Sequence, residues 1–178
     1  PTAVEAEAFD RTLCDVVVCG VGAVECGAAM ARVVSEKCPD VVILAGVAGS
    51  YSSRYDVGQT VAVRTEIVAD MGRVESWSEI GGERFTPLFQ KEYSATDTPD
   101  GYDAVRSNTV NGCGVPYVVT DGVDVENMEG AAFFATAQAL GVRSMQLRTI
   151  SNRVGERFDI ADVRRCAVEL ARAVAEVV

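Results

Sequence analysis

The hydrophobic pattern of this chain begins with two short apolar runs, each followed by glycines. Residues 15–19 and 40–45 are rich in valine and isoleucine, as is typical of strands that are covered on both faces. Residues 23–37 between them are largely helix formers and end before a proline. A strand, a helix and a strand within about 30 residues predict a right-handed βαβ unit and a parallel sheet.

Further strands are predicted along the rest of the chain. Residues 59–68 are rich in valine, threonine and isoleucine, which favours a strand. Residues 104–110 and 115–120 flank an Asn-Gly turn at 111–114, and this arrangement predicts a hairpin. Residues 142–150 predict another buried strand.

Two helices complete the predicted fold. Residues 126–140 predict a long helix that Gly141 caps, and residues 159–178 predict an amphipathic helix whose apolar face carries Val163, Ala167, Leu170 and Val174. Residues 72–101 are polar and show no sustained period, so we expect a loop or lid there. The elements together predict a single α/β domain over residues 1–178, a three-layer α/β/α sandwich with a central mixed sheet.

Composition and charge narrow the possible functions. With 178 residues, 48% of them apolar, the chain is long enough for one compact domain. No apolar run approaches the roughly 20 residues that span a bilayer, and the first residues lack the features of a signal peptide. We therefore expect a cytoplasmic protein without a membrane partner. A formal net charge of −10 repels polyanions, so no nucleic-acid partner is expected.

Acid–base chemistry in this chain must fall to carboxylates. The sequence contains no histidine, which excludes Ser-His-Asp and Cys-His nucleophile systems and every histidine metal site. Its six cysteines include no C-x-x-C pair, so neither a zinc site nor a redox motif is indicated. We expect no metal and no cofactor.

Two glycine turns that follow predicted strands favour one ligand crevice. Gly20 and Gly22 open the predicted helix, and residues 46–49 follow the next strand; ligands of open α/β sheets bind at the carboxyl ends of strands. A dinucleotide fingerprint needs a third glycine where this chain has Glu25. A nicotinamide or flavin site is therefore disfavoured, and a tight turn with small-residue packing is the alternative.

Polar residues at a helix start and at a strand end are the other candidates. Residues 126–130 combine acidic side chains with the apolar Met128, which favours a buried, ligand-facing helix start; a surface turn that complements the helix dipole is the alternative. Residues 148–152 end a buried strand in the amide of Asn152. This amide is either a ligand contact or only a turn former.

In order and spacing, these segments resemble the purine nucleoside phosphorylase and nucleosidase superfamily. Its hydrolase branch includes methylthioadenosine/adenosylhomocysteine nucleosidases and futalosine hydrolases. The resemblance covers most of the chain, through residues 2–7 (TAVEAE), 20–22 (GVG), 46–49 (GVAG), 57–61 (VGQTV), 127–130 (NMEG) and 148–152 (RTISN). Each motif is weak alone, but their order and spacing are specific. The resemblance implies a homodimer or higher homo-oligomer.

The resemblance also implies roles for individual residues. Glu129 would grip the ribose hydroxyls, since a carboxylate accepts two hydrogen bonds from a vicinal diol, and Met128 would pack against the sugar. Glu7 would orient and activate the attacking water, with Glu5 as a less favoured substitute. Asn152 would address the base. The remaining substrate-binding residues would be Asn127, Val47, Ala48, Gly49 and Gly22.

Asn152 also distinguishes branches of the superfamily. Adenine-cleaving members usually carry an aspartic acid at this place, whereas an amide NH2 offers two donors to N7 and O6 of a 6-oxopurine. A flipped amide is also compatible with adenine. Residues 146–155 look most like the futalosine hydrolases of menaquinone biosynthesis. We therefore expect hydrolysis of futalosine, a small purine nucleoside, with release of hypoxanthine.

Three other functions stay open. Val47 stands where phosphorylases tend to have a hydroxyl residue to help hold phosphate, which favours water as the acceptor. The alternatives are a methylthioadenosine/adenosylhomocysteine nucleosidase, a purine nucleoside phosphorylase and a catalytically silent nucleoside-binding domain.

The aromatic residue that stacks on the base is not assigned by the sequence; its candidates are Phe85, Tyr93, Tyr117 and Phe133.

Overall fold

The computed structural model describes residues 2–77, 82–88, 91–156 and 158–178. Its centre is a six-stranded mixed sheet in the order β5-β2-β6-β7-β1-β8. The strands are β1 (Val41–Ser50), β2 (Thr60–Val68), β5 (Glu92–Ser94), β6 (Ala104–Thr109), β7 (Val125–Asn127) and β8 (Arg143–Arg153). β1 and β8 are parallel along their length, and β2 also pairs with β8 in antiparallel orientation, so that the sheet curls back on itself.

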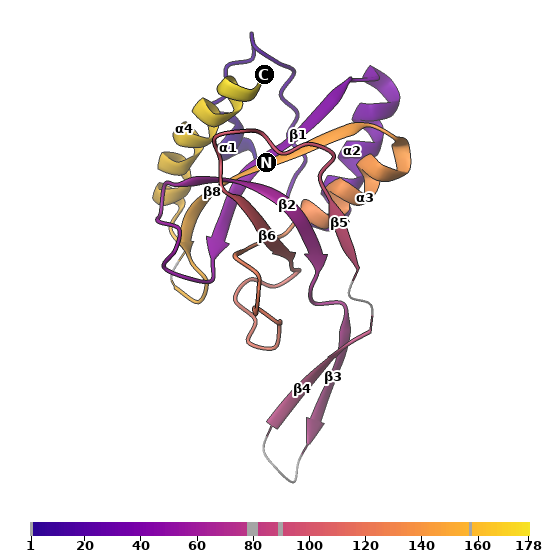
Figure 1. Cartoon of the computed structure of the whole chain (residues 1–178), viewed down its shortest axis with the longest axis vertical. Coiled ribbons are helices and arrows are strands. Elements are labelled where there is room, and N and C mark those ends of the chain that lie inside the picture. Colours follow the sequence, from indigo (N-terminus) through magenta and orange to yellow (C-terminus); the bar gives the residue numbers. More distant parts are fainter. Residues whose placement is uncertain (1, 78–81, 89–90, 157) are drawn as a thin grey trace.

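Helices cover both faces of this sheet (Figure 1). They are α1 (Ala3–Ala6), α2 (Ala23–Lys37), α3 (Gly130–Leu140) and α4 (Ile160–Val177). α2 and α3 lie on one face, and α4 lies on the other with the short α1 beside it. None of the helices in the described part of the chain has the length and apolar character needed to cross a membrane.

The apolar core is divided by the sheet into two parts. The larger part joins Met30 of α2 and Phe134 of α3 to Leu44 of β1. The smaller part joins Leu170 of α4 to Leu147 of β8. Because neighbouring residues of a strand point to opposite faces, the same strands supply side chains to both parts and hold the helices at fixed positions around the sheet.

The structure confirms the three-layer architecture and most of the long elements. α2 has the predicted bounds and ends at Cys38, whose backbone is left-handed. α4 begins after Asp159, whose side chain accepts a hydrogen bond of 2.8 Å from the amide of Ala161; such a cap satisfies a backbone donor of the first turn. The predicted strands at 59–68 and 142–150 are present as β2 and β8.

The predicted strand at residues 15–19 is wrong, because these residues form irregular chain. Val16 and Val17 line a cavity of about 440 Å³ together with Val42 and Ile43 of β1. The two segments therefore share a cavity and do not pair as a ladder. The predicted βαβ unit is accordingly not formed here, and β1 finds its parallel partner in β8 instead.

The prediction of a loop or lid at residues 72–101 is corrected by three strands. β3 (Gly72–Trp77) and β4 (Gly82–Pro87) form an antiparallel pair of their own, which projects from the body of the molecule in Figure 1, and β5 joins the edge of the main sheet. A two-stranded ribbon that is not covered by helices imposes little periodicity on its sequence. Residues 78–81 and 89–90 of the segment lie outside the described residues.

The predicted hairpin around residues 111–114 is also wrong. Residues 115–120 form turns and irregular chain, and the strand beside β6 is β7. The amide of Gly114 donates a hydrogen bond of 2.8 Å to Glu126, and Asn111 is bound to Asp70, so the loop is held by side chains. Because β7 takes up residues from the predicted helix start, α3 begins only at Gly130.

Candidate functional site

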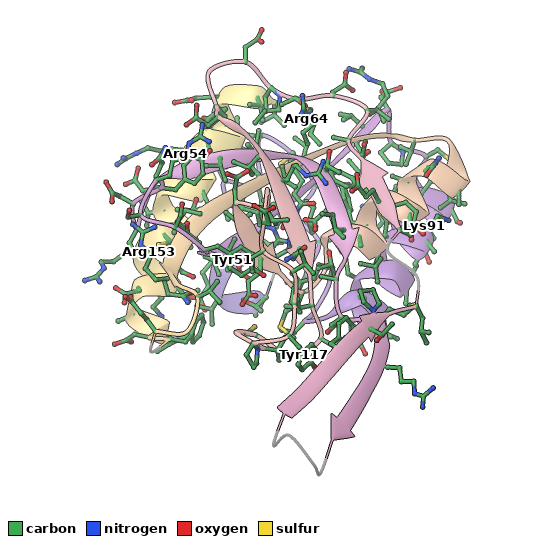
Figure 2. All side chains as sticks on the ribbon, turned by 60° about the horizontal axis from the view of Figure 1, so that its bottom comes forward. Tyr51, Arg54, Arg64, Lys91, Tyr117 and Arg153 are labelled. Atoms are coloured by element: carbon green, nitrogen blue, oxygen red, sulfur yellow. The ribbon has the colours of Figure 1, made fainter. Side chains whose placement is uncertain are left out.

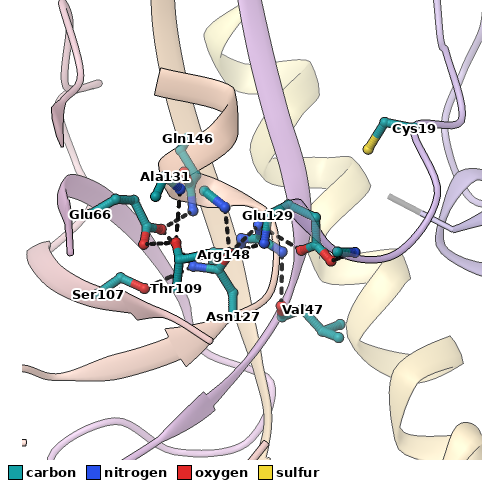
Figure 3. A network of polar contacts seen from close by, with 12 residues as sticks. Cys19, Val47, Glu66, Ser107, Thr109, Asn127, Glu129, Ala131, Gln146 and Arg148 are labelled. Carbon is teal, nitrogen blue, oxygen red and sulfur yellow. Dashed lines mark hydrogen bonds and ion pairs between the residues drawn. The ribbon is translucent and has the colours of Figure 1, made fainter. Parts of the chain in front are cut away.

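The buried guanidinium of Arg148 joins several elements around the sheet by hydrogen bonds (Figure 3). Arg148 lies on β8 with 3% of its side chain exposed. It donates hydrogen bonds to the carbonyl of Val47 (3.1 Å), to Oδ1 of Asn127 (2.9 Å) and to Oε2 of Glu129 (3.1 Å). These residues belong to β1, to the end of β7 and to the start of α3. A buried cation must be paired, and the hydrogen bonds of this one connect β8 to β1, β7 and α3.

Glu129 links the beginnings of two helices. It is the N-cap residue of α3, and its Oε1 accepts a hydrogen bond of 3.0 Å from the amide of Gly22, the N-cap residue of α2. Its Oε2 forms the ion pair with Arg148. A carboxylate is stabilised near helix N-termini by the helix dipole. Of the predicted site residues, Gly22, Val47, Asn127 and Glu129 therefore lie in one hydrogen-bonded group.

The acidic residue of α1 that joins this group is Glu5, whereas Glu7, the predicted water-activating residue, lies outside it. Glu5 is 5% exposed, and its Oε1 accepts a hydrogen bond of 2.8 Å from the amide of Val47. Its Oε2 accepts hydrogen bonds from the amide and the hydroxyl of Thr2. Glu7 is the exposed C-cap residue of α1. Positions two apart on a helix differ by about 200°, so the two carboxylates cannot both face β1.

The carboxyl of Glu5 is ionised at neutral pH despite its burial. Burial raises its pKa, but the hydrogen bonds from Thr2 and Val47 outweigh this effect and hold the pKa below its usual value. An ionised carboxylate has only acceptor capacity. Glu5 can therefore receive a proton or a hydrogen bond from a ligand or a water molecule.

Gly46 leaves the space in which Glu5 and Arg148 approach the same strand. A Cβ atom at this position would lie 2.5 Å from Nη1 of Arg148 and 3.2 Å from Oε1 of Glu5. A side chain there would displace one of the two charged groups, which is why a glycine is needed. The two groups then flank Val47, since one accepts from its amide and the other donates to its carbonyl.

These charges suit a neutral ligand that is rich in hydroxyl groups. The carboxylates of Glu5 and Glu129 outnumber the one guanidinium near them, so an anion such as phosphate is repelled. Hydroxyl groups and water can donate to both carboxylates. Among the described side chains, no three of the types His, Cys, Asp and Glu are arranged to bind a metal ion.

Asn152 lies further along the same two strands. It pairs with Gly49 after an irregularity in the β1–β8 register, and a Cβ atom at Gly49 would lie 3.6 Å from its Nδ2. The amide donates to the carbonyl of Arg153 (2.8 Å) and accepts from the hydroxyl of Ser151 (2.9 Å). Asn152 and Gly49 thus lie beyond the group around Arg148, towards the ends of β1 and β8.

Two further predicted ligand residues lie beside this group. Met128 is half-buried between the end of β7 and the start of α3. The side chain of Ala48 belongs to the larger apolar core. The prediction that Ala48 contacts the substrate can therefore hold only for its backbone atoms.

The aromatic candidates lie in two different environments. Phe133 is 3% exposed and belongs to the larger core, against which Tyr93 packs. Phe85 of β4 and Tyr117 pack on each other with 4.9 Å between ring centroids, and Figure 2 shows Tyr117 near the base of the projecting hairpin. Phe133 is a core residue, and the base-stacking role stays a prediction for the others.

Two buried charges of the sheet, Arg148 and Glu66, were given no role from the sequence. Arg148 is part of a recognised motif, and Glu66 of β2 was not singled out, although it is 0% exposed. The signal was available, because each charge interrupts a strand that is otherwise mostly apolar or neutral. Such residues are almost never fully buried unless they are paired, so each predicts a partner elsewhere in the chain.

Comparison with known sequences finds similarity over part of the chain. Residues 103–178 match the sequence model of the Phosphorylase superfamily. The chain is also 28% identical over 157 residues to the futalosine hydrolase of Thermus thermophilus, an alignment that covers 78% of this chain and 68% of that protein. The family model thus includes the segment that carries Asn127, Glu129, Arg148 and Asn152.

Solved structures share the fold at low sequence identity. The 5′-methylthioadenosine/S-adenosylhomocysteine nucleosidase of Neisseria meningitidis, in complex with methylthio-immucillin-A, has a TM-score of 0.69 and 20% identity over 90% of this chain and 78% of its own. The futalosine hydrolase of Helicobacter pylori has a TM-score of 0.69 and 15% identity over 90% and 77%. The sequence matches and the shared fold confirm the resemblance of this chain to the phosphorylase superfamily.

Proposed function

We propose that this chain is a nucleosidase that hydrolyses the N-glycosidic bond of a purine nucleoside, and that its substrate is futalosine, from which it releases hypoxanthine. The observation that carries this proposal is the convergence of Glu5 and Arg148 on Val47 of β1, with Glu129 paired to Arg148. The 28% sequence identity with a futalosine hydrolase and the fold shared with nucleosidases support it.

The chemistry requires a base for water and a grip on the sugar. As the bond to the purine stretches, its electron pair moves onto the base, which then takes up a proton from solvent, and the sugar becomes an oxocarbenium ion. Water then attacks the anomeric carbon and passes a proton to Glu5, whose carboxylate is ionised and fixed by the amide of Val47. Glu129 accepts hydrogen bonds from the two ribose hydroxyls. Arg148 holds Glu129 in place for this task.

Water is favoured over phosphate as the nucleophile. Arg148 already donates to Glu129, Asn127 and Val47, and the nearby Glu5 repels anions. A phosphate would need basic and hydroxyl groups of its own, and at Val47 this strand offers an apolar side chain. The phosphorylase alternative is therefore disfavoured.

The identity of the base rests on Asn152. Its amide nitrogen can donate to N7 and O6 of a 6-oxopurine once it leaves the carbonyl of Arg153. Hydrogen bonds that strengthen as the base departs lower the barrier more than bonds already formed in the ground state. This favours hypoxanthine, whereas a methylthioadenosine/adenosylhomocysteine nucleosidase would release adenine. A role in menaquinone biosynthesis and assembly into a homo-oligomer are further predictions of the resemblance, and a cytoplasmic location stays a prediction from the sequence.

A panel of substrates tests the proposed function. Purified protein is incubated with futalosine, inosine, adenosine and methylthioadenosine, each with and without phosphate, and the products are separated by chromatography. We expect hypoxanthine and a free sugar from futalosine at the same rate in both buffers. Release of a sugar 1-phosphate only in phosphate would contradict hydrolysis. Binding without turnover of any nucleoside would support the silent nucleoside-binding domain.

Replacement of Asn152 by aspartate tests the base assignment. The substitution removes the amide donors, so we expect a loss of kcat/KM on 6-oxopurine nucleosides of about tenfold or more, from one lost hydrogen bond to the departing base. A protonated carboxyl can also form hydrogen bonds with adenine. The ratio of activity on 6-aminopurine nucleosides to activity on 6-oxopurine nucleosides is therefore expected to rise. An unchanged ratio of the two activities would remove Asn152 from the site.

A further inference from the structure

Glu66 is a fully buried carboxyl that the proposed chemistry does not use. It lies on β2, and its oxygens accept hydrogen bonds from Thr109 (2.8 Å), Asn127 (2.5 Å) and Gln146 (2.7 Å). Burial raises its pKa by more than Arg148 and these three donors lower it, so the pKa lies above its usual value. A buried carboxyl is costly unless its hydrogen bonds are made. The three donors meet that requirement and bind Glu66 to three different strands.

The amide of Asn127 connects Glu66 to the candidate site (Figure 3). Its Nδ2 donates to Glu66 and to the hydroxyl of Ser107. Its Oδ1 then faces three donors, which are the amides of Glu129 (2.9 Å) and Gly130 (2.8 Å) and Nη2 of Arg148 (2.9 Å). A flipped amide would place its NH2 against all three donors. The acceptor on Glu66 therefore favours the orientation of the Asn127 amide in which Oδ1 faces these three donors.

The first turn of α3 is built directly over the same carboxyl. A Cβ atom at Gly130 would overlap the carboxyl of Glu66, so the helix start can approach this closely only with a glycine. Thr109, which donates to Glu66, also accepts a hydrogen bond of 2.8 Å from the amide of Ala131. The positions of three successive amides at the start of α3 thus depend on partners of Glu66.

We propose that Glu66 is a positioning residue of the nucleoside site, which acts through Asn127 to orient Glu129 and Arg148. This proposal rests on the proposed function for its effect on catalysis. Glu66 itself touches no substrate: it fixes one amide, and that amide fixes both the carboxylate expected to hold the ribose and the guanidinium that pairs with it.

Three variants test the role of the acceptor on Glu66. Glu66→Leu removes it, so we expect kcat to fall between about 10-fold and 100-fold, the range for small displacements of positioned groups, with a smaller change in KM. Glu66→Gln keeps a carbonyl that can accept from Asn127 and is expected to retain activity within about threefold. Gln146→Leu is the matched control, because Gln146 is as buried and donates to the same oxygen but forms no hydrogen bond with Asn127 among the described residues.

Hydrogen exchange provides a readout that needs no substrate. In Glu66→Leu, the amides of Glu129 and Gly130 are expected to lose protection about tenfold relative to slow amides of α4, since their acceptor is no longer oriented. In Gln146→Leu the same ratio should fall much less, because Asn127 keeps its acceptor on Glu66. If the unmodified protein turns over no nucleoside, the proposed function fails, whereas the exchange measurement still decides the role of Glu66.

The proposal is overturned by either of two results. One is unchanged exchange at Glu129 and Gly130 in Glu66→Leu, and the other is an equal loss of kcat in Glu66→Leu and Gln146→Leu, which would indicate a general packing effect. If Glu66→Leu does not fold, Glu66→Asp replaces it, since it keeps the carboxyl but withdraws the acceptor by about 1.5 Å. It is then expected to show the same two losses, and their absence would overturn the proposal.

Discussion

Replacement of Glu5 by glutamine is expected to lower kcat by between about 100-fold and 10,000-fold, the usual contribution of a positioned general base. Glutamine fits the same space and can still accept from the amide of Val47, but it cannot take a proton from the attacking water. The measurement is the rate of hypoxanthine release from futalosine at saturating substrate, together with the thermal unfolding of each variant.

Glu7→Gln is the matched control, because it makes the same chemical change two residues away on the exposed end of α1. Its kcat is expected to stay within about twofold of the unmodified protein, as for most exposed substitutions. The pH profile gives a second readout. Since the pKa of Glu5 is held below its usual value of 4.5, the ionised base persists as the pH falls, and activity should be lost only below that value. Loss of activity in Glu7→Gln instead would restore the original prediction.

Replacement of Glu129 by glutamine is expected to lower kcat/KM by on the order of a hundredfold or more, which is the size of effects from lost positioning in the transition state. The substitution removes the charge that Arg148 pairs with and one acceptor for the ribose hydroxyls. The variant is compared with the unmodified protein on the same nucleoside, below the unfolding temperature of both.

Glu36→Gln serves as the control for Glu129→Gln. Glu36 lies on α2, is exposed and forms an ion pair only with the equally exposed Arg32 among the described contacts. Exposed pairs contribute little to stability, so this variant should match the unmodified protein in activity and in unfolding temperature. Near-normal turnover in Glu129→Gln would return Glu129 to a purely structural role at the start of α3.

The parts of the fold that sequence predicts well are those whose signals are local. α2 was predictable from its helix formers and the proline that follows it, and α4 from its apolar stripe and its cap, as Leu170 and Asp159 show. The strand expected at 15–19 is as rich in valine as the start of β1, yet pairing depends on a neighbour at the right distance, and a cavity lies there instead. Composition cannot reveal that difference.

The sequence predicted some residues of the candidate site but not the orientation of others. The motifs brought Gly22, Asn127 and Glu129 to one place correctly. The choice between Glu5 and Glu7 depended on the rotation of a four-residue helix against β1, which no pattern in so short a segment can fix. Glu66 had a signal, an acidic residue in a buried strand, but its partner Asn127 comes from a distant part of the chain.

A crystal structure with hypoxanthine and ribose, or with an uncleaved purine nucleoside analogue, tests the central claim most directly. We predict that the two vicinal hydroxyls of the sugar contact Glu129, that its anomeric carbon faces Glu5 and Val47, and that the base lies within hydrogen-bond distance of Asn152. A ligand bound elsewhere, or one that contacts Glu129 while Asn152 stays remote from the base, would contradict the claim.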